Sequence, residues 1–186
     1  MPDFTFVTSN DHKVMTAQAV CDAFGVTFSR KHLDLVEIQA DNGEAIGRHK
    51  AEQAFDICHT PVVISDDSWI IPGLNGFPGP YMKYMNEWLT AEDFQRLTSQ
   101  LENRRIILHQ VVVYKDAQHE QLFTADLEGV LLEEVRGKHP LFAHFAITSL
   151  DGGKHSLAEA DTLSKPTVSE LNSSYHKLCT WLKSRS

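Results

Sequence analysis

The stretch at residues 8–13 carries residue types that suit phosphate binding. Thr8, Asn10 and Lys13 stand between an apolar run and an amphipathic one. Where a strand turns into a helix, free backbone N–H groups and the positive helix end point at one spot, which favours a phosphate. Lys13 would add a full charge there. The plainer alternative is that Asn10 only caps the helix and that Lys13 is solvated.

Two adjacent carboxylates, Asp66 and Asp67, follow the apolar run at residues 62–64. Neighbouring carboxylates repel each other unless water or a cation relieves the repulsion. Mg²⁺ prefers one or two carboxylates together with phosphate oxygens of a substrate. The pair therefore suits a magnesium site at the end of a strand, and a simple turn that begins with Asp is an equal alternative.

A loop dense in glycine and proline covers residues 72–80, and Lys83 follows it. Glycine lets the backbone approach a ligand closely, and proline stiffens the loop. Such a loop more often lines a site than serves only as a connector. Lys50 and Lys165, taken alone, are ordinary surface lysines.

The elements that position these residues are predicted from hydrophobic periodicity. Early strands alternate with helices, and later strands cluster into antiparallel candidates, which predicts an α/β fold with a mixed central sheet and flanking helices. We find no repeat or linker, so we expect a single domain over residues 1–186. The expected strands are 4–8, 33–38, 62–64, 106–114, 121–127 and 130–135, and the expected helices are 14–24, 44–58, 81–89, 91–101 and a last one from about 169.

Composition excludes several classes of protein. A formal charge of −8 argues against general binding to nucleic acid or to a membrane surface, because phosphate-backbone binding relies on excess Lys and Arg. No apolar run reaches the roughly 18 residues that span a bilayer, and no signal sequence is found. The cysteines, Cys21, Cys58 and Cys179, are odd in number and lack a C-x-x-C, which favours neither a disulfide framework nor a zinc site. Cys58 and Cys179 fall where helical apolar faces are expected, which favours buried free thiols. We expect a soluble cytoplasmic protein.

In their order, these motifs resemble the inosine/xanthosine triphosphate pyrophosphatase family, also called Ham1-like. The resemblance spans roughly residues 4–115 and implies two lobes with a cleft between them. It also implies a homodimeric, Mg²⁺-dependent enzyme that cleaves non-standard purine nucleoside triphosphates to the monophosphate and pyrophosphate. The matching segments are Thr8-x-Asn10-x-x-Lys13, Glu37-Ile38-Gln39, Lys50, Asp66-Asp67-Ser68 and the segment from Gly73 to Lys83.

The resemblance also implies roles for individual residues. Thr8, Asn10, Lys13 and Lys50 would hold the triphosphate, and Asp67 would be the catalytic or metal-binding carboxylate. Further roles fall to the metal ligands Asp66 and Glu44 and to the substrate contacts Lys83, Lys165 and Ser169.

Two departures from the family pattern affect these roles. The metal-binding Glu that the family places five residues before Lys50 is Ala45 here, with Glu44 one residue earlier, and such a slip turns a helical side chain by about 100°. Glu44, Glu37 and Asp41 are the candidates to replace it. The base-recognition motifs Phe-Gly-Tyr/Trp-Asp and Ser-His-Arg are also missing, which predicts altered or relaxed base discrimination because buried donors and acceptors set it.

Three hypotheses follow. The first is a pyrophosphatase that acts on a non-standard purine nucleoside triphosphate. The second is a nucleotide-binding module of the same fold with little or no turnover, suggested by Ala45 and the missing base motifs. The third, ranked lowest, is a purely structural role in an oligomer.

Overall fold

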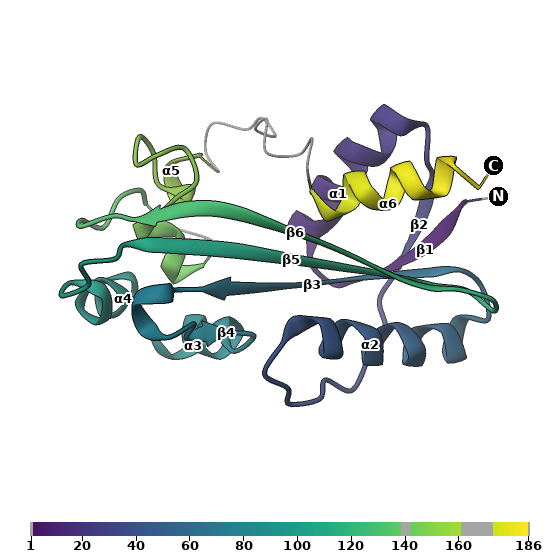
Figure 1. Ribbon diagram of the computed structural model, residues 1–186, viewed down its shortest axis with the longest axis horizontal. Coiled ribbons are helices and arrows are strands. Elements are labelled where there is room, and N and C mark those ends of the chain that lie inside the picture. The colour runs from purple at the N-terminus through teal and green to yellow at the C-terminus, as the bar shows by residue number, and fades with distance from the viewer. Residues whose placement is uncertain (1, 139–141, 161–172, 186) are drawn as a thin grey trace. The chain divides into compact units, whose positions relative to one another are not determined.

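The structure is a computed structural model that describes residues 2–138, 142–160 and 173–185. Within these residues, seven strands form one mixed sheet in the order β2-β1-β3-β5-β6-β7, with β4 paired to β3 (Figure 1). The strands are β1 (Phe4–Val7), β2 (Phe28–Lys31), β3 (Val62–Ile70), β4 (Pro78–Gly79), β5 (Arg105–Lys115), β6 (Glu120–Leu131) and β7 (Thr148–Ser149). The helices are α1 (Asp11–Phe24), α2 (Gly43–Cys58), α3 (Met82–Trp88), α4 (Ala91–Thr98), α5 (Leu157–Ala160) and α6 (Ser174–Lys183), with 3-10 helices η1 (Pro72–Leu74) and η2 (Ala143–Ile147). The mixed α/β class is thus as predicted.

The chain divides into two compact units. Among the described residues, the first contains 2–67, 110–125 and 173–185, and the second contains 68–109, 126–138 and 142–160. Each unit therefore collects segments that are distant in the sequence. The prediction of a single domain over residues 1–186 stays a prediction.

In the first unit, β1 pairs in parallel with both β2 and β3. α1 and α6 cover one face of this part of the sheet, and α2 covers the other (Figure 1). Val63 of β3 packs with Phe6, α1 and α6, whereas Val62 and Ile64 pack with Ala51 and Ala54 of α2. Odd-numbered residues of β3 thus face α1 and α6 here, and even-numbered ones face α2, as the two-residue period of a strand requires.

α2 lies close against the sheet because of one glycine. A Cβ added at Gly47 would lie 3.1 Å from Val113 Cγ2 and 3.2 Å from Val111 Cγ1 of β5. The helix begins at the cap residue Asn42, whose side-chain oxygen accepts the Ala45 N–H at 2.8 Å. The position of the helix in turn sets where Lys50, one turn after Gly47, can reach.

The second unit has its own apolar core. Phe94 of α4, Ile106 of β5 and Ile147 of η2 are among its fully buried residues. The Gly/Pro loop lies beside this core, since Gly79 and Pro78 of β4 pair with Trp69 and Ile70 of β3. No helix in the described part of the chain is long and apolar enough to cross a membrane.

Two strand predictions are wrong. The second strand is β2 at residues 28–31, and residues 33–38 form no strand; Leu33 and Leu35 pack on the α2 core from an irregular segment, which imitates strand alternation. β6 is one strand where two were predicted, and residues 132–135 are not part of it. Gly129 stands inside β6 because a Cβ there would lie 2.7 Å from the Ser149 carbonyl oxygen of β7.

Smaller differences concern element ends and one thiol. α4 ends at Thr98, before the expected residue 101, and Cys58 is half-buried where a buried thiol was expected. α6 begins at Ser174, and residue 169, the expected start, lies outside the described residues.

Candidate functional site

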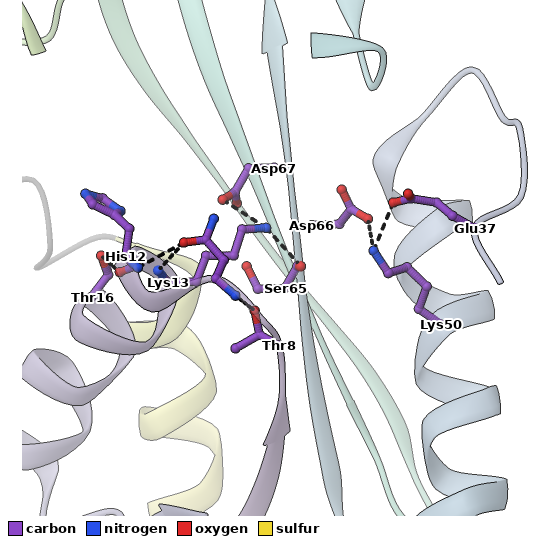
Figure 2. Close-up of polar contacts among 10 residues, drawn as sticks. Thr8, His12, Lys13, Thr16, Glu37, Lys50, Ser65, Asp66 and Asp67 are labelled. Carbon is purple, nitrogen blue, oxygen red and sulfur yellow. Dashed lines mark hydrogen bonds and ion pairs between the residues drawn. The ribbon is translucent and has the colours of Figure 1, made fainter. Parts of the chain in front are cut away.

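The two carboxylates lie within β3, before the strand ends at Ile70, where a strand end or turn was predicted. Because neighbouring strand residues point to opposite faces, Asp67 faces α1 and Asp66 faces α2 (Figure 2). Each carboxylate meets a lysine from the helix on its own side. One strand therefore presents two lysine–carboxylate pairs at consecutive positions.

On the α1 side, Lys13 holds two groups of β3. Its Nζ lies 3.3 Å from Asp67 Oδ2 and donates to the Ser65 carbonyl oxygen at 3.0 Å (Figure 2). About a fifth to a quarter of each side chain is exposed, 21% for Lys13 and 26% for Asp67. Both charges are therefore partly desolvated yet open to a ligand, which strengthens their action on a charged group.

On the α2 side, Lys50 lies between two carboxylates. Its Nζ is 3.1 Å from Asp66 Oδ2 and 3.0 Å from Glu37 Oε1. Burial alone would lower the pKa of Lys50, but the negative charges and hydrogen bonds of Asp66 and Glu37 outweigh it, so the pKa is raised. Lys50 is thus a permanent cation at neutral pH.

The turn from β1 to α1 is ordered by its own polar groups. Asn10 Oδ1 accepts the N–H groups of His12 and Lys13 at 2.9 and 3.3 Å, and Thr8 Oγ1 accepts the Asn10 N–H at 3.1 Å. Asn10 is therefore a helix cap, the alternative that the sequence left open. Its oxygen occupies two of the amide groups that a phosphate at this helix end would use.

Arg30 was missed by sequence reasoning. From β2 it donates to the Thr8 and Ser9 carbonyl oxygens at 3.1 and 2.7 Å, and it pairs with Asp11 at 2.6 Å. It thereby ties the turn before Lys13 to the neighbouring strand. The strand was predicted in the wrong place, so nothing in the sequence drew attention to Arg30.

A buried hydroxyl cluster adjoins the Lys13 side. Ser65 Oγ and Tyr175 Oη are both buried and have no hydrogen-bond partner among the described residues. Burial and the nearby Asp67 carboxylate raise the pKa of Tyr175. Tyr175 comes from α6. Buried polar groups that lack partners are costly, so these two deserve a functional explanation.

The remaining predicted site residues are not brought into this cluster by any described contact. Glu44, in the first turn of α2, makes no ion pair or hydrogen bond within the described residues. Lys83 belongs to the second unit, where its Nζ lies 5.8 Å from the centre of the Tyr84 ring. Lys165 and Ser169 lie outside the described residues. The roles of these four residues stay predictions.

The carboxylates of this site fit a divalent cation only together with a phosphorylated ligand. In the described part of the chain, no three His, Cys, Asp or Glu side chains form a metal site by themselves. Asp66 and Glu37, however, both bind one ammonium group, so their oxygens already converge on a cation. Two carboxylates completed by substrate phosphate oxygens are a coordination that Mg²⁺ accepts. The donor set therefore fits a divalent cation that arrives with a phosphorylated ligand.

Known protein sequences resemble this chain over most of its length. A model of the Ham1 family matches residues 4–181. The chain is 27% identical to a dITP/XTP pyrophosphatase of Hyperthermus butylicus over 95% of this chain and 92% of that protein. It is 33% identical to inosine triphosphate pyrophosphatase 1 of Trypanosoma cruzi over 72% of this chain and 68% of that protein.

Solved structures show the same fold. A HAM1 protein from Coxiella burnetii superposes with a TM-score of 0.78 at 17% identity, covering 99% of this chain and 100% of that one. The Ham1 protein of Staphylococcus aureus gives a TM-score of 0.77 at 17% identity, covering 98% of this chain and 100% of that one.

Proposed function

Because the chain belongs to the Ham1 family, we propose that it is a pyrophosphatase for non-standard purine nucleoside triphosphates such as XTP, ITP and dITP. The relatives named above support the substrate class through their names. The single observation that carries the proposal is the pairing of Lys13 and Lys50 with consecutive carboxylates of β3. Two lysines and two carboxylates meet at this strand. Because lysine ammonium groups form charge-assisted hydrogen bonds with phosphate oxygens, the site suits a polyphosphate better than a neutral ligand.

The reaction is hydrolysis at the α-phosphorus. A water oxygen bonds to this phosphorus, the bond from the phosphorus to the bridging oxygen of the β-phosphate breaks, and pyrophosphate leaves with the negative charge. Asp67 orients the water and accepts its proton. Lys13 and Lys50 stabilise the charge that develops on the phosphoryl oxygens and on the leaving pyrophosphate. Arg30 keeps the turn that carries Lys13 in place.

We assign a Mg²⁺ site to Glu37 and Asp66, completed by oxygens of the triphosphate. When bound, the ion would supply charge neutralisation and polarisation of the phosphoryl group. Lys50 would then give up its contact with these two carboxylates in part and turn to the phosphates. In this assignment Glu37 takes the place of the family Glu that is Ala45 here, and Glu44 is not required.

The proposal also includes a homodimer and a cytoplasmic location. The homodimer rests on the resemblance described above, and light scattering coupled to size-exclusion chromatography tests it. A reducing compartment agrees with three free cysteines. Base discrimination differs from that of the family because the usual motifs are absent, so we expect more than one base to be accepted.

The test is a substrate panel. Purified protein is incubated with Mg²⁺ and XTP, ITP, dITP, dUTP, GTP or ATP, and nucleotide and phosphate products are separated by ion-exchange chromatography. The proposal predicts monophosphate and pyrophosphate from the first three. Release of orthophosphate with a diphosphate would place the cut at the wrong bond, and tight binding of XTP without any product would favour a binding module.

A further inference from the structure

Two buried thiols lie next to each other in the first unit. Cys21 Sγ of α1 is 3.7 Å from Cys179 Sγ of α6, although the residues are 158 positions apart in the chain. Both side chains are fully buried. α1 and α6 pack side by side along this contact (Figure 1). The pair was not foreseen, since the sequence shows only three widely spaced cysteines.

The surroundings distinguish the two thiols. The pKa of Cys179 is lowered by its contact with the Cys21 thiol and by the positive charge of Lys183, while burial and Asp3 act in the opposite direction. The pKa of Cys21 is raised by the same contact, by burial and by the charges of Asp22 and Asp3. Of the two thiols, Cys179 is the one beside a positive charge, that of Lys183, which favours a thiolate, so Cys179 attacks an oxidant and Cys21 is the thiol that resolves the product.

We propose that Cys21 and Cys179 form a reversible disulfide that links α1 to α6 when the protein meets a peroxide. The Cys179 thiolate attacks one oxygen of hydrogen peroxide, the O–O bond breaks, and a sulfenic acid and hydroxide form. The Cys21 sulfur then attacks Cys179 Sγ and expels water. In total, two thiols and one peroxide give one disulfide and two waters, and the peroxide is the species reduced.

Geometry favours this product over others. The sulfurs must approach by less than 2 Å to reach the S–S bond length of about 2.05 Å, which side-chain rotation and a small helix shift can supply. Cys58 is no competitor inside the described residues, since it belongs to α2 on the other face of the sheet and contacts Lys31. Both thiols of the pair are buried, so peroxide gains access through local opening of α6.

The disulfide acts on stability. It closes a loop of more than 150 residues, which restricts the unfolded chain strongly and stabilises the fold in the chain-entropy view. We expect the melting temperature to rise by roughly 5–10 °C. Cys21 lies eight residues after Lys13 on α1, about 12 Å along the helix axis, so the link leaves the Lys13–Asp67 pair untouched.

The test uses the full chain and hydrogen peroxide. After oxidation, free thiols are alkylated, and intact mass and peptide mapping identify the link. The proposal predicts loss of two hydrogens, a peptide pair joined at Cys21 and Cys179, and a melting temperature that returns to its starting value with dithiothreitol. Cys58→Ala is the matched control and keeps all three results, whereas Cys21→Ala loses the link.

A sulfinic or sulfonic acid at Cys179, with no peptide joined to Cys21, would overturn the proposal. So would oxidation confined to Cys58. Because the mapping is done on the unaltered chain, a variant that folds poorly does not affect the result. None of these measurements requires enzyme activity.

Discussion

Lys13 Nζ of α1 lies 3.3 Å from Asp67 Oδ2, one residue along β3 from the carboxylate that Lys50 of α2 binds at 3.1 Å. The strand thus separates two acidic neighbours onto different faces and gives each its own lysine (Figure 2). Because they face different sides of the sheet, the two carboxylates can take different roles. In the proposed function, Asp67 serves the attacking water, and Asp66 with Glu37 serves the cation.

Replacing Lys13 tests the phosphate contact. Lys13→Met keeps the aliphatic stem but removes the charge beside Asp67, so kcat/KM for XTP is expected to fall by about 100-fold or more. Steady-state pyrophosphate release measures it. Lys177→Met is the matched control, since Lys177 on α6 is exposed and donates to the Thr124 carbonyl oxygen. Equal activity of the two variants would contradict the assignment.

Glu37 and Glu44 give opposite predictions for Mg²⁺. Glu37→Gln removes one of the two carboxylate charges beside Lys50. The Mg²⁺ concentration for half-maximal activity is therefore expected to rise about tenfold or more. Glu44→Gln is expected to leave it unchanged. Mg²⁺ titrations at fixed XTP measure both values. If the required Mg²⁺ concentration rose only in the Glu44 variant, Glu44 and not Glu37 would be the carboxylate that replaces the family's metal-binding Glu.

Arg30 acts through the turn before α1. Arg30→Met removes three bonds to the turn, including those to the carbonyl oxygens of Thr8 and Ser9. Since Lys13 is then held less firmly, kcat/KM is expected to fall about tenfold. The melting temperature changes by only a few degrees, because these bonds are exposed. Kinetics and thermal unfolding together check this, and a variant with full activity would show that the tie has no role.

The buried hydroxyl of Tyr175 is expected to lower the stability of the fold and to support activity. Tyr175→Phe removes a buried hydroxyl that has no partner among the described residues, so the free energy of unfolding is expected to stay equal or rise by about 1 kcal/mol. If the hydroxyl serves Asp67 or a bound ligand, kcat falls about tenfold in the same variant. Urea unfolding and kinetics distinguish the two effects. A less stable variant with normal kcat would mark the hydroxyl as structural only.

His144 makes the second unit sensitive to mild acid. Burial lowers its pKa to about 3, and its Nδ1 lies 2.8 Å from Asn86 Oδ1. Because the pKa is lower in the folded state, the unfolded chain binds more protons below about pH 6.5, and stability falls as the pH drops toward 3. Between pH 6.5 and about pH 5 the loss is about 1.5 kcal/mol.

The measurement compares His144→Gln with the unaltered chain. The glutamine variant is expected to be less stable at neutral pH, but its unfolding free energy is expected to lose most of its dependence on pH in this window. Urea unfolding at several pH values gives both curves. Parallel curves would show that another group carries the dependence.

Periodicity was sufficient for the elements that hold the lysines. α1 and α2 follow their apolar spacing, and Asn10 and Asn42 cap them as short polar residues do. β2 could not be found in this way, because an edge strand that reads Phe-Ser-Arg-Lys buries little and shows no alternation. The sequence also did not show that β3 continues through Asp66 and Asp67. Two adjacent Asp residues after an apolar run are typical of the start of a turn.

Residues that meet across the fold could not be predicted from spacing. Cys21 and Cys179 are joined only by the packing of α1 on α6. Glu37 reaches Lys50 from an irregular segment, where no period applies. Resemblance to a family pointed to Lys13, Lys50 and Asp67, but it could not tell which carboxylate each lysine would bind.

The most direct test of the account is pyrophosphate release from XTP by the unaltered chain and by Asp67→Asn, measured side by side with saturating Mg²⁺. We predict monophosphate and pyrophosphate in equal amounts from the unaltered chain, and a kcat lower by about 100-fold or more in the variant, with XTP still bound. Turnover by Asp67→Asn within about threefold of the unaltered chain would contradict the central role of this carboxylate.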